Sequence, residues 1–286
     1  MQPDLALCPF EVDRPVMLHR WERLTFLHWS YEPADVQRLL PAGLEVEQYE
    51  GRAWVGLVPF TMHVATASDR SVPWAANFCE TNVRTYVRDR DGRSGIWFFS
   101  LDAARLGAVA IARVTYRLPY FWSQMRVEPG DRRIDYWCRR RWPGPVGAKS
   151  AVSIKIGEAY EPGELHNLDH LLTAKWILFS ASGSRRRFAR AWHAPWPLHH
   201  ATVLECHDEL VEASGLPAPR GDPLVHYSPG VEVRIGQPER YQQRGSSSTA
   251  VSLQRSTIRS TVCSGVKPDE STHRPTAGDV DNHSSN

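Results

Sequence analysis

Apolar and polar residues alternate along most of the chain in short runs of strand length. These runs are rich in Val, Ile, Phe, Trp and Tyr and are separated by turn signals built from Gly, Pro, Asp and Asn. The predicted strands cover 44–47, 53–60, 79–88, 95–101, 121–127, 133–142, 151–158, 186–196, 200–211 and 231–235. Helices are predicted at 32–40, 103–112 and 167–180. Strands and helices do not alternate regularly, so the pattern predicts an α+β fold, mostly antiparallel β, formed by a curled sheet or barrel with a few short helices.

The composition changes near residue 236. All 11 tryptophans lie between Trp21 and Trp196, whereas the residues after 236 are rich in Ser and Thr and have Tyr241 as their single aromatic residue. Such a segment cannot bury enough apolar surface to offset the conformational entropy it would lose on ordering. We therefore predict a flexible N-terminus over 1–14, one folded domain over 15–236 and a disordered tail over 237–286.

Charge and motifs argue against several classes of protein. The 34 Lys+Arg nearly balance the 32 Asp+Glu, whereas a nucleic-acid-binding domain is usually strongly basic. No apolar run is long enough to span a membrane, and the N-terminus lacks the pattern of a secretory signal. The five cysteines form no C-x-x-C pair, and the glycine motifs that bind phosphates are absent. We expect a cytoplasmic protein without nucleic-acid or membrane partners and without a cofactor, while a homo-oligomer remains open.

Two histidines resemble a metal pair only in their spacing. His166 and His170 are four residues apart, as in some zinc sites. In the zinc-protease pattern a Glu follows the first His, and here Asn167 takes that place. No metal site is predicted.

The strand at 79–88 carries the most informative polar pattern. Side chains of a strand alternate between its two faces. One face carries Glu80, Asn82, Arg84, Tyr86 and Arg88. The strand at 95–101, which returns after the turn, is apolar throughout, so we favour a polar row that lines a pocket. A solvated sheet face is the alternative.

Two arginines need partners. Glu80 and Arg84 lie about 13 Å apart along the strand and cannot pair as direct neighbours. Arg84 and Arg113 are therefore exposed, paired with acids such as Glu80 or Asp102, or available to an anionic ligand, since a buried unpaired Arg is costly. In the last case they would hold a carboxylate through paired hydrogen bonds. Glu80 or His28 could then move protons if burial shifts its pKa.

Several short motifs occur in a characteristic order. They are LTFLHW at 24–29, LLPAGL at 39–44, VGLVPF at 55–60, ETNVRTYV at 80–87, WFFSLDA at 97–103, LPY at 118–120 and HAPWPL at 193–198. Over about residues 15–236 this series resembles the YqjF-like family, a bacterial domain of unknown function.

That family is grouped by fold with acetoacetate decarboxylase, so the resemblance implies a β-rich fold curled around a central cavity. Acetoacetate decarboxylase uses a lysine Schiff base, and its lysine follows a proline near the middle of the chain. If LPY occupies that place, the position holds Tyr120, which cannot form an imine. The chain has only four lysines, which are Lys149, Lys155, Lys175 and Lys267.

Three functions remain open at this point. The first is a pocket for a small organic acid, with an unknown reaction. The second is a lysine-dependent decarboxylase, and the third is a non-enzymatic binding or scaffold protein. The candidate ligand-binding residues are Asn82, Arg84, Tyr86 and Arg113, and the candidate catalytic groups are Glu80, His28 and Tyr120. Whether the protein is an enzyme is not decided by these residues.

Overall fold

The computed structural model describes residues 7–66, 77–107, 109, 118–161, 163–182 and 185–240. The strands are β1 Met17–Tyr31, β2 Leu44–Val46, β3 Gln48–Tyr49, β4 Arg52–Thr66, β5 Asn77–Asp89, β6 Ser94–Ala103, β7 Tyr120–Pro129, β8 Arg133–Trp142, β9 Lys149–Ala159, β10 Ile177–Ser182, β11 Arg185–His193, β12 His199–Asp208, β13 Leu224–Ile235 and β14 Glu239–Arg240. The helices are α1 Pro33–Gln37, α3 Asn167–Thr173 and α4 Leu210–Ala213. Strand β14 pairs with β11, so the sheet extends to residue 240. The rest of the predicted tail, from residue 241 onward, lies outside the described residues.

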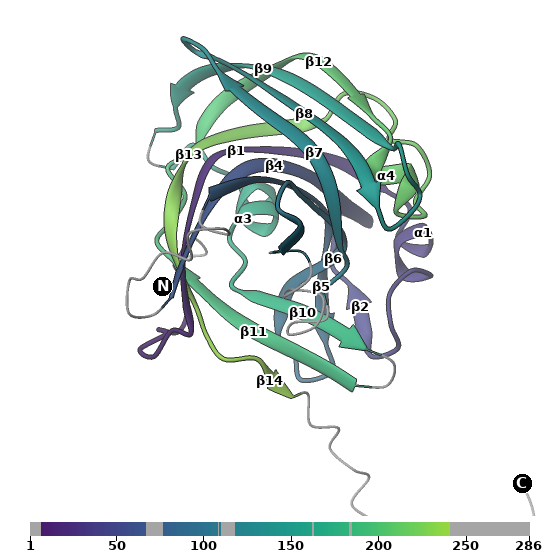
Figure 1. Cartoon of the computed structure of the whole chain (residues 1–286). Helices are drawn as coiled ribbons and strands as arrows, with labels where there is room; N and C mark the ends of the chain where they lie inside the picture. Colours follow the sequence, from purple (N-terminus) through teal and green to yellow (C-terminus); the bar gives the residue numbers. More distant parts are fainter. Residues whose placement is uncertain are drawn as a thin grey trace, which may run out of the picture. The chain divides into compact units, whose positions relative to one another are not determined.

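The strands form one large sheet that curls back on itself (Figure 1). Hydrogen-bonded neighbours follow the order β14-β11-β10-β6-β7-β8-β9-β12-β13-β1-β4-β5-β2, and the pairs β11–β13 and β6–β5 join the sheet to itself. Strands β13, β1, β4, β5 and β6 are therefore shared by two closed circuits. We call the circuit completed by β10 and β11 the small ring, and the one completed by β7, β8, β9 and β12 the large ring.

The strand directions confirm the predicted fold class. Neighbouring strands are antiparallel, except that β6 runs parallel to both β7 and β10. Short helices account for the rest of the regular structure, as expected for a curled, mostly antiparallel α+β fold. Within the described part of the chain, no helix is long and apolar enough to cross a membrane.

The segment after residue 173 differs from the sequence-based prediction. The helix predicted over 167–180 ends at Thr173, and Ile177 begins strand β10. Its Leu178 and Phe179 pair with β6, while Ile177 and Phe179 pack into a small apolar cluster. Helical apolar spacing is a weak signal over so few residues, and tertiary pairing overrides it. The helix predicted at 103–112 is found only in part. Ala103 belongs to strand β6, whereas Leu106, Gly107 and Val109 are helical. Residues 110–112 lie outside the described residues.

Strand β1 is central to the sheet but was not among the predicted strands. It pairs with β4 on one side and β13 on the other. Arg20, Glu22 and Arg23 interrupt its apolar pattern, and Arg23 adopts a left-handed φ of 54° at an irregularity in the pairing with β4. After that point the strand is buried from Leu24 to Trp29, and no alternation remains over these six residues to mark it.

The shared strands separate two apolar interiors. Leu24 and Phe26 of β1 belong to the cluster inside the small ring, whereas Leu27 and Trp29 belong to the cluster inside the large ring. Alternating side chains of one strand therefore serve different rings. This explains why 53–60 in β4 is almost wholly apolar, since both of its faces are covered.

A fully buried ion pair lies near the junction of β6 and β7. Arg140 of β8 donates through Nε and Nη2 to the two carboxylate oxygens of Asp102, at 2.9 and 2.6 Å. Ser123 donates to the same carboxylate at 2.7 Å, and the guanidinium carbon lies 3.7 Å from the centre of the Phe121 ring. Both charged groups are thus shielded from solvent, but two parallel hydrogen bonds join the guanidinium to the carboxylate.

The substitution Asp102→Ala tests this anchor, because it leaves the Arg140 guanidinium buried without its counter-ion. We expect the free energy of unfolding to fall by about 3–5 kcal/mol, measured by urea denaturation with tryptophan fluorescence. The control is Asp135→Ala, since Asp135 pairs with Arg133 at the surface, where solvent screens the charges. Similar losses in both variants would contradict the assigned role of the buried pair.

Candidate functional site

The small ring encloses a cavity of about 420 Å³. Its wall is mainly apolar and is formed by side chains of β1, β4, β5, β6, β10 and β11. These include Leu24, Phe60, Met62, Phe98, Leu178 and Phe188. A volume of this size lies within the range of about 300–1,000 Å³ typical of small-molecule pockets.

Strand β5 places its polar residues in this wall. Glu80, Asn82 and Arg84 all line the cavity, and they are 2%, 5% and 5% exposed. Val83, between them in sequence, points into the apolar interior of the large ring instead. The face favoured by the sequence as the lining of a pocket is therefore the face that lines the cavity, although ligand binding by these residues stays a prediction.

Glu80 is set up to hold a proton. Burial raises the pKa of Glu80 to about 8, while a hydrogen bond from Tyr120 opposes this shift and the negative charge of Asp102 adds to it. The Tyr120 hydroxyl donates to Glu80 Oε2 at 3.0 Å, and both side chains line the cavity. Near neutral pH the surroundings of Glu80 thus favour its neutral, protonated form.

Arg84 has no acidic partner among the described residues. Asp102 is taken by Arg140, and Glu80 is bonded to Tyr120, so neither acid considered from the sequence pairs with Arg84. The guanidinium instead donates to the backbone oxygen of Leu172 at 3.2 Å and to the Tyr86 hydroxyl at 3.3 Å. Of the alternatives open for Arg84, exposure is excluded, and none of the acids that the structure describes pairs with it. Arg113, the second arginine, lies outside the described residues.

Tyr86 and His28 stand behind Arg84 and do not belong to the lining of the cavity. Tyr86 gives its only hydroxyl proton to the oxygen of Leu172, at 2.6 Å. Its oxygen must therefore accept from His28 Nε2, 2.5 Å away, as well as from Arg84. This fixes the proton of His28 on Nε2. Burial, with the charges of Arg84 and His226, lowers the pKa of His28 well below its ordinary value.

Helix α3 supplies contacts that the sequence did not reveal. The backbone oxygen of Leu172 accepts from Tyr86 and Arg84, and that of Thr173 accepts from Trp196. At the other end, Asp169 accepts from His226 at 3.0 Å and from the backbone of His166. Carbonyl acceptors have no sequence signature, and the partners are far apart in the chain.

The lysines do not reach the cavity. Lys149 and Lys155 are exposed, and Lys175 is held by Glu47 and Ser94, each 2.5 Å from its Nζ. None of these three lines the cavity, and Lys267 lies outside the described residues. The described residues thus offer no lysine for an imine at this site.

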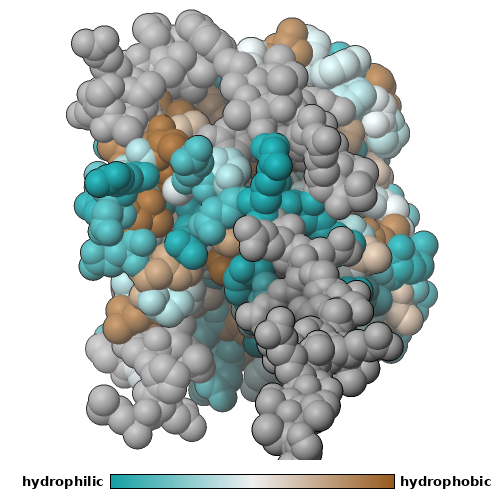
Figure 2. Space-filling view, turned by 90° about the horizontal axis from the view of Figure 1, so that it is seen from below, coloured by the Kyte–Doolittle hydropathy of each residue, from teal (hydrophilic) through white to brown (hydrophobic). Residues whose placement is uncertain are grey.

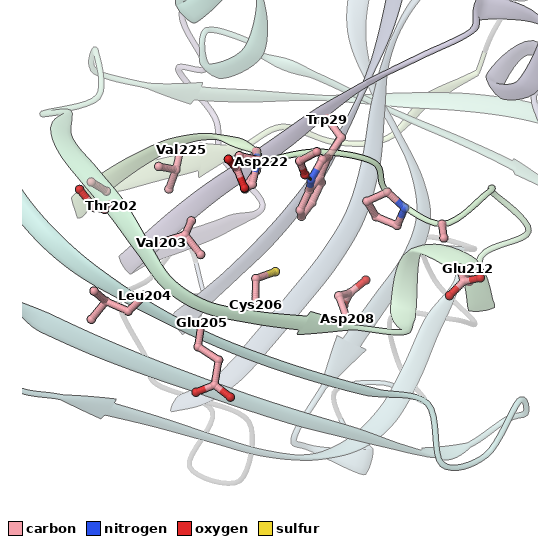
Figure 3. A pocket seen from close by; sticks show the side chains of 15 residues that line it. Trp29, Thr202, Val203, Leu204, Glu205, Cys206, Asp208, Glu212, Asp222 and Val225 are labelled. Atoms are coloured by element: carbon pink, nitrogen blue, oxygen red, sulfur yellow. Dashed lines mark hydrogen bonds between the residues drawn. The ribbon is translucent and has the colours of Figure 1, made fainter.

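A second, open groove of about 690 Å³ runs along β12 and contains acidic residues (Figure 3). In Figure 3, Glu205 points away from Asp208, and Glu212 lies at the far end on α4. Burial raises the pKa of Asp208 to about 6, and this side chain accepts from the backbone of Val211 at the start of α4. These acids do not converge, and the described residues contain no group of three or more His, Cys, Asp or Glu able to hold a metal. The cavity of the small ring is therefore the better candidate.

Comparisons with known proteins define first the fold and then the family. The fold is shared with an acetoacetate decarboxylase-like enzyme from Sphingomonas wittichii, with a TM-score of 0.56, 14% identity, and coverage of 80% of this chain and 94% of that one. It is also shared with the enduracididine biosynthesis enzyme MppR, with a TM-score of 0.57, 14% identity, and coverage of 79% and 88%. These likenesses show the fold alone.

The sequence comparisons define the family. A family described as "Uncharacterized conserved protein" matches residues 19–232. The uncharacterised protein YqjF of Bacillus subtilis is 33% identical over 220 residues, which cover 74% of this chain and 87% of that protein. The chain belongs to this YqjF-like family, and the resemblance found in its motifs is confirmed.

The proton on Glu80 gives a prediction for stability. Because its folded-state pKa of about 8 lies above the ordinary 4.5, the proton stabilises the fold fully below the ordinary pKa, and this contribution is lost as the pH rises through the folded pKa. Glu80→Gln is neutral at every pH. Relative to the original protein, we expect it to gain stability between about pH 5 and about pH 9.

Urea denaturation at three pH values measures this difference, and the titration of Asp208 cancels because both proteins contain it. Glu45→Gln is the control, since Glu45 is exposed on β2 and its substitution should shift stability little at any pH. If the Glu80→Gln difference does not change with pH, Glu80 is not protonated in the fold at neutral pH.

Proposed function

We propose that the cavity of the small ring binds a small amphipathic organic acid, with its carboxylate on Arg84 and its apolar part against the surrounding side chains. The observation that carries this proposal is the buried, cavity-lining guanidinium of Arg84 without a carboxylate partner among the described residues. A buried cation without a counter-ion is costly, and an anionic ligand would supply one.

Proton transfer is the chemistry that the cavity supports. Glu80 has a pKa of about 8 and a hydrogen bond from Tyr120, so it can gain or lose a proton near neutral pH. A ligand anchored at Arg84 lies on the same strand face as Glu80. An enzyme acting by acid–base chemistry on a bound organic acid therefore fits the site, and a pure binding protein would use the same contacts.

The fold relatives support an acid as ligand in a limited way. MppR has been solved in complex with pyruvate, itself a small organic acid, at 14% identity to this chain. A lysine-dependent decarboxylase gains no support, because Lys149, Lys155 and Lys175 stay away from the cavity. A scaffold role would be favoured by a large exposed apolar patch. On the face drawn in Figure 2, the visible described residues show mainly hydrophilic side chains across the middle, with separate apolar areas between them.

Arg84→Met tests the proposal through ligand binding. With octanoate as the probe, we expect Arg84→Met to bind roughly a hundredfold more weakly, because two charge-assisted hydrogen bonds are lost. Arg84→Lys keeps the charge without the paired geometry and should lose about tenfold. Trp21 lines the cavity, so tryptophan fluorescence reports occupancy, and calorimetry provides the dissociation constants.

Arg139→Met is the matched control, since Arg139 is an exposed arginine on β8. It should bind octanoate like the original protein. Circular dichroism establishes that each variant is folded, because Arg84 also holds the Leu172 carbonyl. The uncharged analogue octanamide should bind at least tenfold more weakly than octanoate. Equal binding of octanoate by the original protein and by folded Arg84→Met would refute the anchoring role.

A further inference from the structure

The carboxamide of Asn82 is a buried polar group whose oxygen accepts no hydrogen bond from the described residues. Its side chain lines the cavity, and its Oδ1 is buried with no hydrogen-bond partner among the described residues. Leaving a buried acceptor unpaired is destabilising, whereas an apolar side chain of the same shape would avoid this cost. A donor that enters the cavity recovers this energy.

The position of Asn82 fixes where that donor belongs. It lies between Arg84 and Glu80 on one face of β5, about 6.6 Å along the strand from each. A ligand anchored through its carboxylate on Arg84 therefore passes Asn82 before it approaches Glu80. The neutral polar group of the ligand is then close to its carboxylate, and the apolar body extends towards Phe60 and Met62, which lie opposite Glu80 and Phe78 in the neighbouring strand.

The Glu80 end of the polar row on β5 disfavours a second negative charge on the ligand. Glu80 lies buried at this end, and the nearby negative charge of Asp102 already favours its protonated form. A second carboxylate of the ligand would lie in an apolar wall near both acids. The cavity therefore suits a single negative charge at the Arg84 end.

Resting on the function proposed above, we propose that the ligand is an amphipathic monocarboxylate with a hydroxyl group near its carboxylate. Arg84 holds the carboxylate and Asn82 pairs with the hydroxyl. A hydroxyl can donate to Oδ1 or accept from Nδ2, so it matches the carboxamide in either orientation. An oxo group at the same place can only accept, so with the carboxamide oriented as in the structure it leaves Oδ1 unpaired.

The test compares eight-carbon probes on the original protein by calorimetry. We use octanoate, 2-hydroxyoctanoate, 3-hydroxyoctanoate, 2-oxooctanoate and octanedioate, with both hydroxy isomers included because the Arg84 side chain is long. We expect one hydroxy isomer to bind about tenfold more tightly than octanoate. The oxo acid and the diacid should bind no more tightly than octanoate.

Asn82→Leu assigns the preference to Asn82. This variant should bind octanoate at least as tightly as the original protein and should lose the preference for the hydroxy acid. Asn77→Leu is the matched control, because Asn77 is an exposed asparagine on the same strand that does not line the cavity, and it should keep the preference.

The outcomes separate the two proposals. If octanoate and both hydroxy acids bind the original protein equally, or if the oxo acid or the diacid binds as tightly as the better hydroxy acid, the ligand class is wrong while anchoring at Arg84 stands. If Asn82→Leu keeps the preference, Asn82 does not select the hydroxyl. If none of the probes binds, the proposed function itself fails.

Discussion

The hydroxyl of Tyr86 is the point on which the polar wall of the cavity depends. One oxygen joins three elements, since it donates to the Leu172 carbonyl of α3 and accepts from His28 of β1 and Arg84 of β5. The backbone makes room for this arrangement. Gly56 pairs with Arg84 in the neighbouring strand, and a Cβ at residue 56 would come within 2.9 Å of the His28 ring. A glycine in a strand interior often marks such a close approach.

This network determines how Arg84 is stabilised without being neutralised. The guanidinium donates hydrogen bonds to a carbonyl oxygen and to a phenol oxygen, both of which carry a partial negative charge. Its central carbon lies 5.3 Å from the centre of the Phe26 ring. These contacts fix its direction but leave a net positive charge in an apolar cavity. The contrast with Arg140 is instructive, because that buried guanidinium has a complete carboxylate partner in Asp102 and is structural. The same residue type thus has two roles that its partners distinguish.

The sequence could predict the polar face of β5 but not what that face meets. Period-two alternation puts Glu80, Asn82 and Arg84 together, and the apolar strand that follows the turn indicated that they are covered. The sequence could not predict that the sheet encloses two apolar interiors. This division depends on the strand pairs β11–β13 and β6–β5, which join the sheet to itself. Strand β10 was missed because its apolar spacing also fits a helix. The Leu172 carbonyl was missed because a backbone acceptor carries no sequence signal.

The division of the sheet into two rings also explains how the protein can keep a cavity. An unfilled volume forfeits packing energy, so a fold selected for stability alone would fill both interiors. Here the large ring is packed by residues such as Leu57, Ile134 and Ile154, and the Asp102–Arg140 pair lies beside it. The small ring instead keeps an open volume with Glu80 and Arg84 in its wall. Close packing and the cavity thus lie on opposite faces of the same shared strands. Substitutions on the cavity face of β5 can therefore alter the proposed ligand contacts while Val83 on the other face keeps the core packed.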